Sequence, residues 1–372
     1  MKTIRKTLAL ILVLSMILAI SASAFAEEDE VLYVNFGDSI AWGRIENEEN
    51  FPEYDWENDS YSGLFAAKLG TERVSYARRG MQTTDVLYMI DGAYQAAVDN
   101  GIINPDSWHQ REYPPYDGTS LDEVRSTTAA ADYISLCIGI CDYISYPGDV
   151  KSAAMEEVPD TDELSAQIKE YFGNGTIDKE AFELLSEILN ANGEKAKITV
   201  KYVLDMLKGY ADYVINYPLI VKDLRSLNKT GTIILMGNYL PGGSLSFLIE
   251  TEDSSKLIAL LNRLLDNINL VAKTAAIEYG CVYVDTMGVE SDWHPTVKGH
   301  QQICDRIVSV LSGDKTYAGG IIVCSAVKDR FLQDIHADVE PADVNGLFGK
   351  LFASLRAFIG RILSLMTKGF KG

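Results

Sequence analysis

Apolar and polar residues are arranged along this chain in blocks that predict an α/β fold. Five short apolar runs, each bounded by glycine or polar residues, are typical of the buried strands of a parallel sheet. They lie at residues 31–36, 74–77, 133–139, 232–237 and 282–285. Between these runs, apolar residues recur at helical spacing, and parallel strands need such crossover helices. The pattern therefore predicts a three-layer α/β/α domain around a central parallel sheet of about five strands.

The helical segments expected from this periodicity are unevenly distributed between the strands. They lie at residues 61–69, 83–100, 162–172, 178–191, 202–227, 256–279 and 296–311. The stretch at residues 145–229 contains several of them and is long for a single crossover, so we expect a helical insertion there. Residues 104–120 are rich in Pro, Tyr and Trp, which fits either a packed surface loop or a platform on which sugars stack. Either segment could shape a cleft.

The N-terminus has the three parts of a secretory signal peptide. Three basic residues precede an apolar stretch at residues 8–20, and Ala24 and Ala26 are the small residues of a cleavage site. We expect cleavage after Ala26, a secreted or cell-surface protein, and one folded domain over residues 27–341. An uncleaved signal anchor is the alternative. No cysteine lies near the cleavage point, which argues against a lipid-anchored lipoprotein.

The composition is acidic, with a formal net charge of −20 at pH 7. Removing residues 1–26, which carry three basic residues and no acidic ones, leaves −23. Such a charge argues against a nucleic-acid partner and favours a soluble exported body. The odd count of five cysteines leaves at least one unpaired, and most of them lie in apolar sequence typical of buried thiols.

The C-terminal residues reverse this charge. Residues 345–372 carry five basic residues and no acidic ones, and their apolar residues recur along one helical stripe. We therefore expect a basic amphipathic helix in a tail over residues 342–372. It would lie on an anionic membrane or envelope surface, or else dock on its own domain or on a partner. Gly349, Gly360 and the flanking charges argue against a membrane span.

The first apolar run ends in a sequence that can carry chemistry. Gly37-Asp38-Ser39 places a serine hydroxyl at the carboxyl end of a buried strand, where open α/β sheets bind their ligands. The glycine allows a sharp turn, and the amides of a following helix would point toward an oxyanion formed there. Alone, this triplet also fits a plain strand-to-helix turn in which Ser39 caps the helix.

A histidine near the last strand supports the chemical interpretation. His294 precedes an expected helix, at a junction from which it can reach a serine at a neighbouring strand end, and Asp292 lies close by. Of the other histidines, His300 fits a structural position on a helix face, whereas His109 and His336 lie in polar, loop-like sequence. No second ligand is near His109 or His336, so the sequence indicates no metal site.

Together these blocks resemble the SGNH or GDSL family of serine hydrolases over about residues 31–311. Besides the Gly-Asp-Ser triplet, the block at residues 76–84 contains Gly80, which matches the family glycine whose amide serves the oxyanion hole. The strand at residues 131–142 is similar to the family strand that ends in Gly-x-Asn-Asp. The last block carries the histidine.

The resemblance implies a flavodoxin-like sheet and a role for each matched residue. Ser39 would be the nucleophile, and His294 would be the general base and then the general acid. The backbone amides of Ser39 and Gly80 would hold the oxyanion.

Two positions depart from the family pattern. Cys141 occupies the place of the family asparagine, whose amide is a strong donor in the oxyanion hole, and a thiol donates only weakly. This fits a slower hydrolase, a different reaction on the same frame, or a binding protein without activity. The family acid stands three residues before the histidine, where this chain has Ser291, so Asp292 is displaced by one residue. It would still orient His294, or a backbone carbonyl would do so instead.

The resemblance implies an exported serine esterase that hydrolyses acyl or acetyl esters of a carbohydrate or lipid by a Ser-His(-Asp) mechanism. That chemistry implies no metal or organic cofactor. The expected partner is a small-molecule, glycan or lipid ester. An acetyltransferase on the same frame stays open, as does a non-catalytic binding protein of the cell envelope.

Overall fold

The computed structural model describes residues 31–45, 48–103, 114–115, 117–143, 158–191, 193–239, 254–291 and 293–313, together with positions 327, 330, 331 and 334. The expected signal peptide at residues 1–26 and the expected tail at residues 342–372 lie outside these residues, as do Asp292, His109 and His336. The chain divides into two compact units, Met1–Val323 and Cys324–Gly372, and the sheet belongs to the first.

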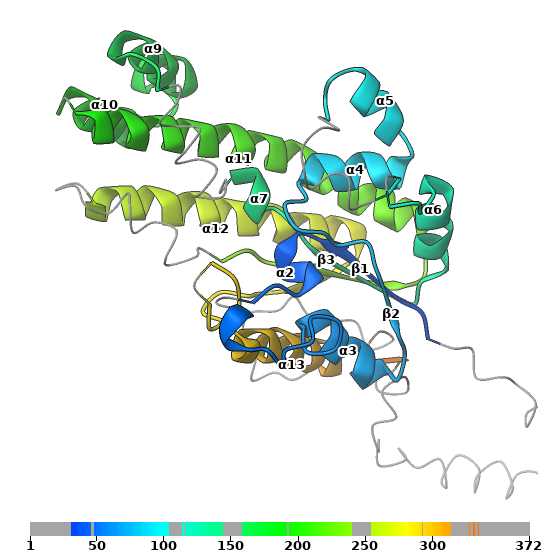
Figure 1. The fold of residues 1–372 in the computed structure, drawn as a ribbon. Coiled ribbons are helices and arrows are strands. Elements are labelled where there is room, and N and C mark those ends of the chain that lie inside the picture. Colours follow the sequence, from blue (N-terminus) through cyan, green and yellow to red (C-terminus); the bar gives the residue numbers. More distant parts are fainter. Residues whose placement is uncertain are drawn as a thin grey trace, which may run out of the picture. The chain divides into compact units, whose positions relative to one another are not determined.

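In the part of the chain that the structure describes, five strands form one parallel sheet, as the apolar runs predict (Figure 1). They are β1 (Tyr33–Gly37), β2 (Arg73–Ser75), β3 (Tyr133–Cys137), β4 (Thr232–Met236) and β5 (Val282–Val284). Their order is β2-β1-β3-β4-β5, and each neighbouring pair is parallel. In this flavodoxin-like order the connections leave β1 and β3 toward opposite edges, so ligands bind in the crevice at the carboxyl ends of these two strands.

Helices cover both faces of the sheet and complete the three predicted layers (Figure 1). On one face lie α4 (Thr83–Asp91), α6 (Leu121–Ala130), α11 (Glu194–Leu227) and α12 (Ser254–Tyr279), and on the other lie α3 (Tyr61–Leu69) and α13 (Val297–Ser312). Every residue of β1, β3 and β4 is buried between them, which explains why these strands read as continuous apolar runs. Among the described helices, none is long and apolar enough to cross a membrane.

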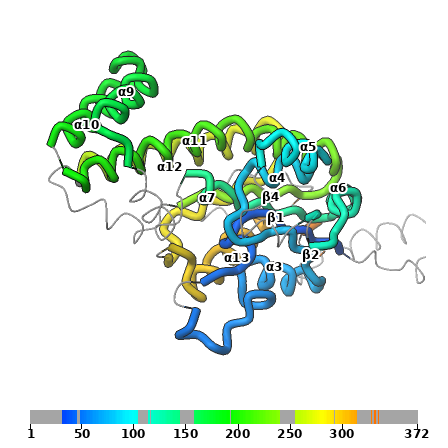
Figure 2. The backbone as a smooth tube through the Cα atoms, turned by 45° about the horizontal axis from the view of Figure 1, so that its top comes forward, coloured from blue at the N-terminus to red at the C-terminus, as the bar shows by residue number. Residues whose placement is uncertain are grey.

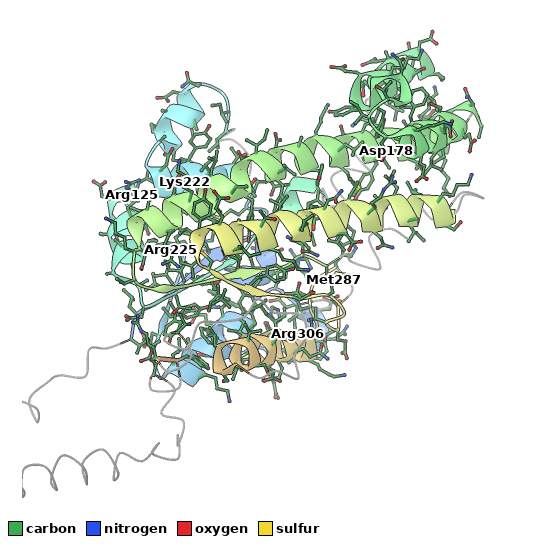
Figure 3. All side chains as sticks on the ribbon, turned by 180° about the vertical axis from the view of Figure 1, so that it is seen from behind. Arg125, Asp178, Lys222, Arg225, Met287 and Arg306 are labelled. Atoms are coloured by element: carbon green, nitrogen blue, oxygen red, sulfur yellow. The ribbon has the colours of Figure 1, made fainter. Side chains whose placement is uncertain are left out.

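The helices between β3 and β4 extend beyond the sheet. α9 (Thr161–Phe172) and α10 (Lys179–Asn190) are joined by a 3-10 turn at Gly173–Gly175 and pack on each other and on α11. Figure 2 shows them at the end of α11 that lies away from the strands. At its other end α11 is fixed by Arg225, labelled in Figure 3, which donates to the carbonyl oxygens of Gly231 and Tyr279, each at 3.0 Å. The helices fall within the stretch in which we expect an insertion.

Four helices, α4, α5, α6 and α11, differ from the sequence prediction. The segment expected at residues 83–100 is two helices, α4 and α5 (Tyr94–Asp99), because Gly92 adopts a left-handed φ of 84° and ends the first. α11 begins at Glu194 rather than at residue 202. The pattern does not predict α6, which has few apolar residues, yet Ser120 caps it by accepting a hydrogen bond from the Glu123 amide at 3.1 Å.

Short helices follow the two central strands. α2 (Ser39–Trp42) begins directly after β1, α7 (Ile140–Tyr143) follows β3, and a 3-10 turn lies at Glu48–Asn50. Helix α11 approaches α7 closely at Gly209, where an added Cβ would lie 1.6 Å from the carbonyl oxygen of Asp142. The lack of a side chain at Gly209 therefore sets the position of α7.

This contact predicts that Gly209→Ala lowers the free energy of unfolding, which is the opposite of the usual effect of this substitution. In a helix interior, replacing glycine by alanine normally stabilises by about 1 kcal/mol. Here the methyl group collides with backbone, and such overpacking costs about 1–3 kcal/mol. We expect a lower free energy of unfolding by chemical denaturation. Gly193→Ala, at a position with open space around it, is the control and should change stability by less than about 1 kcal/mol. A Gly209→Ala protein as stable as the wild type would show that α7 does not lie against α11.

Candidate active site

Gly37 allows β1 to end directly against β3. Its φ is 143°, and an added Cβ would lie 1.9 Å from the carbonyl oxygen of Cys137. The Asp38 amide donates to the same oxygen at 3.1 Å, and the Asp38 carboxylate accepts from the Ile40 amide at 3.0 Å. Asp38 is thus the N-cap of α2, and the alternative in which Ser39 is the cap is wrong. The serine hydroxyl is left for another partner.

That partner is the predicted histidine. Nε2 of His294 lies 3.0 Å from Oγ of Ser39, although the two residues are far apart in the sequence. Both residues are buried, with 3% of Ser39 and 5% of His294 exposed. A serine hydroxyl in hydrogen-bond contact with an imidazole nitrogen is the arrangement that activates a nucleophile. The structure therefore joins the carboxyl end of β1 to the segment that follows β5.

The segment that carries His294 is fastened at both ends. Its start is held by Arg306 of α13, labelled in Figure 3, which donates to the carbonyl oxygens of Asp285 at 3.0 Å and Met287 at 2.8 Å. Its end is held by Thr296, whose amide donates to the Glu290 carbonyl at 3.0 Å and whose hydroxyl caps α13. The imidazole is therefore presented by a closed turn rather than by a free loop.

The predicted orienting acid, Asp292, lies outside the described residues. Ser291, which stands where the family acid is expected, donates its hydroxyl to the Val289 carbonyl at 3.2 Å. The Ser291 side chain thus satisfies the backbone of its own turn.

The loop after β2 brings Gly80 to Cys141. Gly80 has a left-handed φ of 78°. Burial raises the pKa of the Cys141 thiol well above its usual range, and the Gly80 amide, which lies against the sulfur, opposes that shift. Cys141 is therefore a neutral thiol at neutral pH. Within the described residues, the amides of Ser39 and Gly80 donate to no backbone oxygen, and the Gly80 amide is directed at the Cys141 sulfur. Both amides are candidate donors for an oxyanion.

Asp142 ties the same loop to α7. Its carboxylate accepts from the Thr83 hydroxyl at 2.5 Å and from the Thr83 amide at 3.1 Å. Asn216 of α11 donates to the Thr83 hydroxyl oxygen at 3.3 Å. Burial raises the pKa of Asp142 to about 8, although the hydrogen bonds from Thr83 oppose the shift. The sequence places Asp142 in a family block, and the structure shows that it holds the start of α4.

Asp38 is a second buried acid beneath the site. Burial raises its pKa to about 7, against the hydrogen bonds from the Ile40 amide and its neighbours. Its Oδ2 atom has no hydrogen-bond partner among the described residues. Since both Asp38 and Asp142 have raised pKa values, each carries less than a full negative charge near neutral pH.

Asn35 supports the nucleophile from inside the sheet. Its side-chain amide donates to the Ala41 carbonyl of α2 at 2.8 Å. Its oxygen accepts from the hydroxyls of Ser135 at 2.9 Å and Tyr61 at 3.1 Å. This buried network fixes α2 on β1 and β3. Sequence reasoning missed it, although the signal is present, since Asn35 is the polar residue within an apolar strand.

His300 is structural, as expected from its position on α13. It is fully buried, and its Nδ1 accepts from the Tyr61 amide at 3.2 Å. Its Nε2 therefore carries the proton and donates to the Arg44 carbonyl at 3.0 Å. Burial lowers the pKa of His300 to about 4, so the ring stays neutral.

No group of three or more His, Cys, Asp or Glu residues in the described part of the chain is arranged to hold a metal ion.

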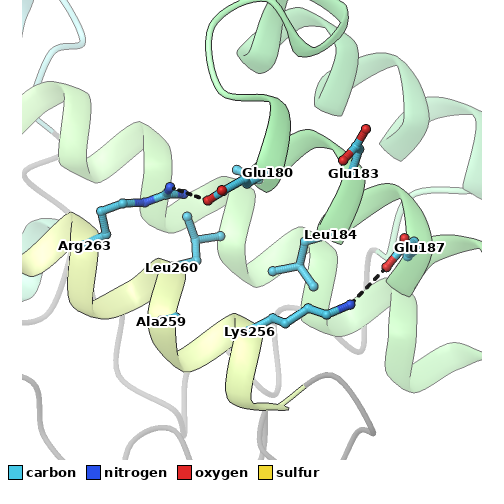
Figure 4. A pocket seen from close by; sticks show the side chains of 9 residues that line it. Glu180, Glu183, Leu184, Glu187, Lys256, Ala259, Leu260 and Arg263 are labelled. Carbon is cyan, nitrogen blue, oxygen red and sulfur yellow. Dashed lines mark hydrogen bonds and ion pairs between the residues drawn. The ribbon is translucent and has the colours of Figure 1, made fainter.

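A cavity of about 410 Å³ lies between α10 and α12, and none of the site residues lines it. Figure 4 shows ion pairs across it, Arg263 with Glu180 at 3.1 Å and Lys256 with Glu187 at 3.4 Å. These ion pairs connect α10 to α12, and they pair charged groups at the rim of the cavity with each other.

Comparison with known proteins finds one family. The family model for the GDSL-like lipases/acylhydrolases matches residues 33–307, which is most of the chain and includes both Ser39 and His294. None of the curated protein sequences matches the chain.

Solved structures with similarity to the chain include two enzymes from Streptomyces and one from Geobacillus. An extracellular lipase from Streptomyces rimosus is 17% identical over 75% of this chain and 99% of its own, with a TM-score of 0.40. Phospholipase A1 from Streptomyces albidoflavus is 14% identical over 75% and 99%, with a TM-score of 0.38. A variant of an acetyl xylan esterase from Geobacillus stearothermophilus is 14% identical over 75% and 93%, with a TM-score of 0.36.

The buried Asp142 predicts a specific dependence of stability on pH. Its folded-state pKa of about 8 lies above its ordinary value of 3.8, so the folded protein binds more protons than the unfolded chain between these values. The free energy of unfolding should therefore fall as the pH rises from about 5 to 8. Asp142→Asn, which resembles the protonated acid, should weaken this fall. Asp122→Asn on the surface of α6 is the control. Equal pH dependence in Asp142→Asn and wild type would contradict the raised pKa.

Proposed function

Because the chain belongs to the GDSL-like lipase/acylhydrolase family, and is thus an ester hydrolase, we propose that it is an exported serine esterase with Ser39 as nucleophile and His294 as general base. The observation that carries this proposal is the buried contact of 3.0 Å between Ser39 Oγ and His294 Nε2. It lies at the carboxyl end of β1, beside the crevice that this sheet order creates.

The proposed reaction has four proton transfers to or from one imidazole, two during acylation and two during deacylation. His294 Nε2 takes the proton of Ser39 as Oγ attacks the ester carbonyl, and then gives it to the leaving alcohol as the tetrahedral intermediate collapses. Water next attacks the acyl-serine and loses its proton to His294. That proton returns to Ser39 when the carboxylic acid leaves. Each step needs the imidazole within hydrogen-bond reach of the hydroxyl, as the structure has it.

The proposed oxyanion hole is built from the amides of Ser39 and Gly80. The Ser39 amide lies at the start of α2, which follows β1 directly. The Gly80 amide lies in the loop before α4, and Asp142 holds that loop through Thr83. Cys141 would add a third, weaker donor, because its thiol is neutral and lies against Gly80. The raised pKa values of Asp38 and Asp142 support this site, since a full negative charge beneath it would oppose the oxyanion.

We propose Asp292 as the group that orients His294, on the ground of its place in the sequence. The substrate class that fits the family is an acyl or acetyl ester, of a carbohydrate or of a lipid. Export follows from the N-terminal pattern at residues 1–26, and the basic tail at residues 342–372 would add contact with an anionic membrane or envelope surface.

The nucleophile is tested by Ser39→Ala. We expect this variant to lose turnover of short activated acyl esters by at least about 1000-fold, with an unchanged melting temperature. His294→Ala should lose a similar amount, because nucleophile and base act as a unit. Ser126→Ala, which removes an exposed hydroxyl from α6, is the matched control and should retain activity. Turnover by Ser39→Ala at the wild-type rate would end the esterase proposal.

The weak third donor is tested by Cys141→Asn. Restoring an amide in the oxyanion hole should raise kcat on a simple acetyl ester, since loss of one such donor elsewhere lowers it by about 100-fold or more. Cys141→Ala separates this gain from an effect of size, and it should not exceed the wild type. A lower kcat for Cys141→Asn would instead indicate a cleft built around the smaller residue. An unchanged kcat would place Cys141 outside the reacting centre.

A further inference from the structure

Arg79 is a cation close to two parts of the site, the short helix that begins at Ser39 and the loop that contains Gly80. It directly precedes Gly80 in the loop after β2. Its guanidinium carbon lies 5.0 Å from the ring centroid of Trp42, the last residue of the short helix that begins at Ser39. Arg79 is thus next to Gly80, which is a proposed oxyanion donor. It also contacts Trp42, which lies one helical turn from the nucleophile Ser39.

The contact with Trp42 leaves the hydrogen-bonding edge of Arg79 unused. A guanidinium has five N–H donors in its plane, whereas a cation-π contact engages its face or its charge and consumes no donor. In the described part of the chain Arg79 makes no ion pair, and its buried Nε has no hydrogen-bond partner. Its neighbour Arg78, by contrast, donates to the carbonyl oxygens of Ser75 and Ala77 and pairs with Asp117 at 3.2 Å.

The aromatic support under Arg79 is itself held in place. Trp42 stacks on Trp56 with ring centroids 4.6 Å apart and 15° between the planes. Arg73 lies 5.4 Å from the Trp56 ring and donates to the Trp56 carbonyl at 3.1 Å. Trp42 and Trp56 also line a cavity of about 780 Å³ that contains Arg73, Arg78 and two glutamates.

A buried donor without an acceptor costs free energy unless a ligand supplies one. The acceptors that match the planar fork of a guanidinium are carboxylate and phosphate. A strongly acidic protein repels anionic substrates over long range, so a substrate with such a group needs a local cation next to the reacting ester.

We propose that Arg79 determines specificity by binding a carboxylate or phosphate group of the ester substrate beside the oxyanion position. This inference rests on the proposed esterase function and narrows its substrate class to esters with an anionic group near the scissile bond. The guanidinium binds that group through its in-plane N–H donors while Trp42 supports its face.

The test compares two matched pairs of esters. The first pair, 4-nitrophenyl hemisuccinate and 4-nitrophenyl butyrate, differs by a charge on the acyl side. The second pair, 4-acetoxybenzoate and its methyl ester, differs by a charge on the alcohol side. The readout is the ratio of kcat/KM for the anionic ester to that for the neutral ester, and the pair that responds locates the anionic group.

Arg79→Gln should lower this ratio by about 10- to 100-fold for at least one pair, chiefly through KM, because a hydrogen bond to a charged group contributes roughly 1.5–3 kcal/mol. Arg79→Lys keeps the charge without the fork and should fall in between. Arg263→Gln removes one exposed positive charge from α12, at a cavity that none of the site residues lines, and should leave both ratios unchanged.

The proposal would be overturned if, for both Arg79 variants, the ratio stays within about twofold of the wild-type ratio in both pairs. In that case, turnover of the neutral esters would still support the esterase function. If the wild type hydrolyses none of the four esters, the esterase function fails and this inference fails with it. A melting curve for each variant separates a change in ratio from a loss of folded protein.

Discussion

The close approach of β1 and β3 at Gly37 is the constraint on which the site depends. The carbonyl oxygen of Cys137 occupies the space in which any side chain at Gly37 would lie, and the Asp38 amide is bonded to the same oxygen. The two central strands therefore end together, and the short helices that follow them start from a common point. Ser39 begins one of these helices and Cys141 lies in the other, so a single backbone contact brings the hydroxyl and the thiol to the same crevice.

The polar groups around this junction are arranged to limit negative charge. Asp38 and Asp142 are buried, and burial raises both pKa values into the range around neutral pH. The Cys141 thiol is neutral for the same physical reason. What remains near the serine is a set of candidate hydrogen-bond donors, and Arg79 directly precedes one of them, Gly80. We propose that this environment stabilises an oxyanion and binds an anionic substrate group. The chain as a whole, by contrast, carries a net charge of −20.

The sequence predicts the sheet and the proximity of Ser39 to His294, because local signals mark the strands and the ends at which both residues lie. Apolar runs mark the five strands, and Gly-Asp-Ser and His294 stand where two of them end. Helix α6 is missed because its residues are mostly polar, although the cap formed by Ser120 and Glu123 is a readable signal. The contact of Gly209 with α7, the bond of Thr83 to Asp142 and the stack of Trp42 on Trp56 join segments that only the tertiary fold brings together. The periodicity of one segment does not show which other segment it contacts, so these features could not be predicted from the sequence.

The central claim is that Ser39 is a nucleophile made reactive by His294. The most direct measurement is labelling of the intact wild-type protein with a phosphonate probe that reacts with activated serines, followed by peptide mass spectrometry to find the modified residue. The account predicts a single phosphonyl group on Ser39, formed in proportion to the loss of ester hydrolysis. Modification of another serine, or inhibition of hydrolysis with Ser39 left unmodified, would contradict it.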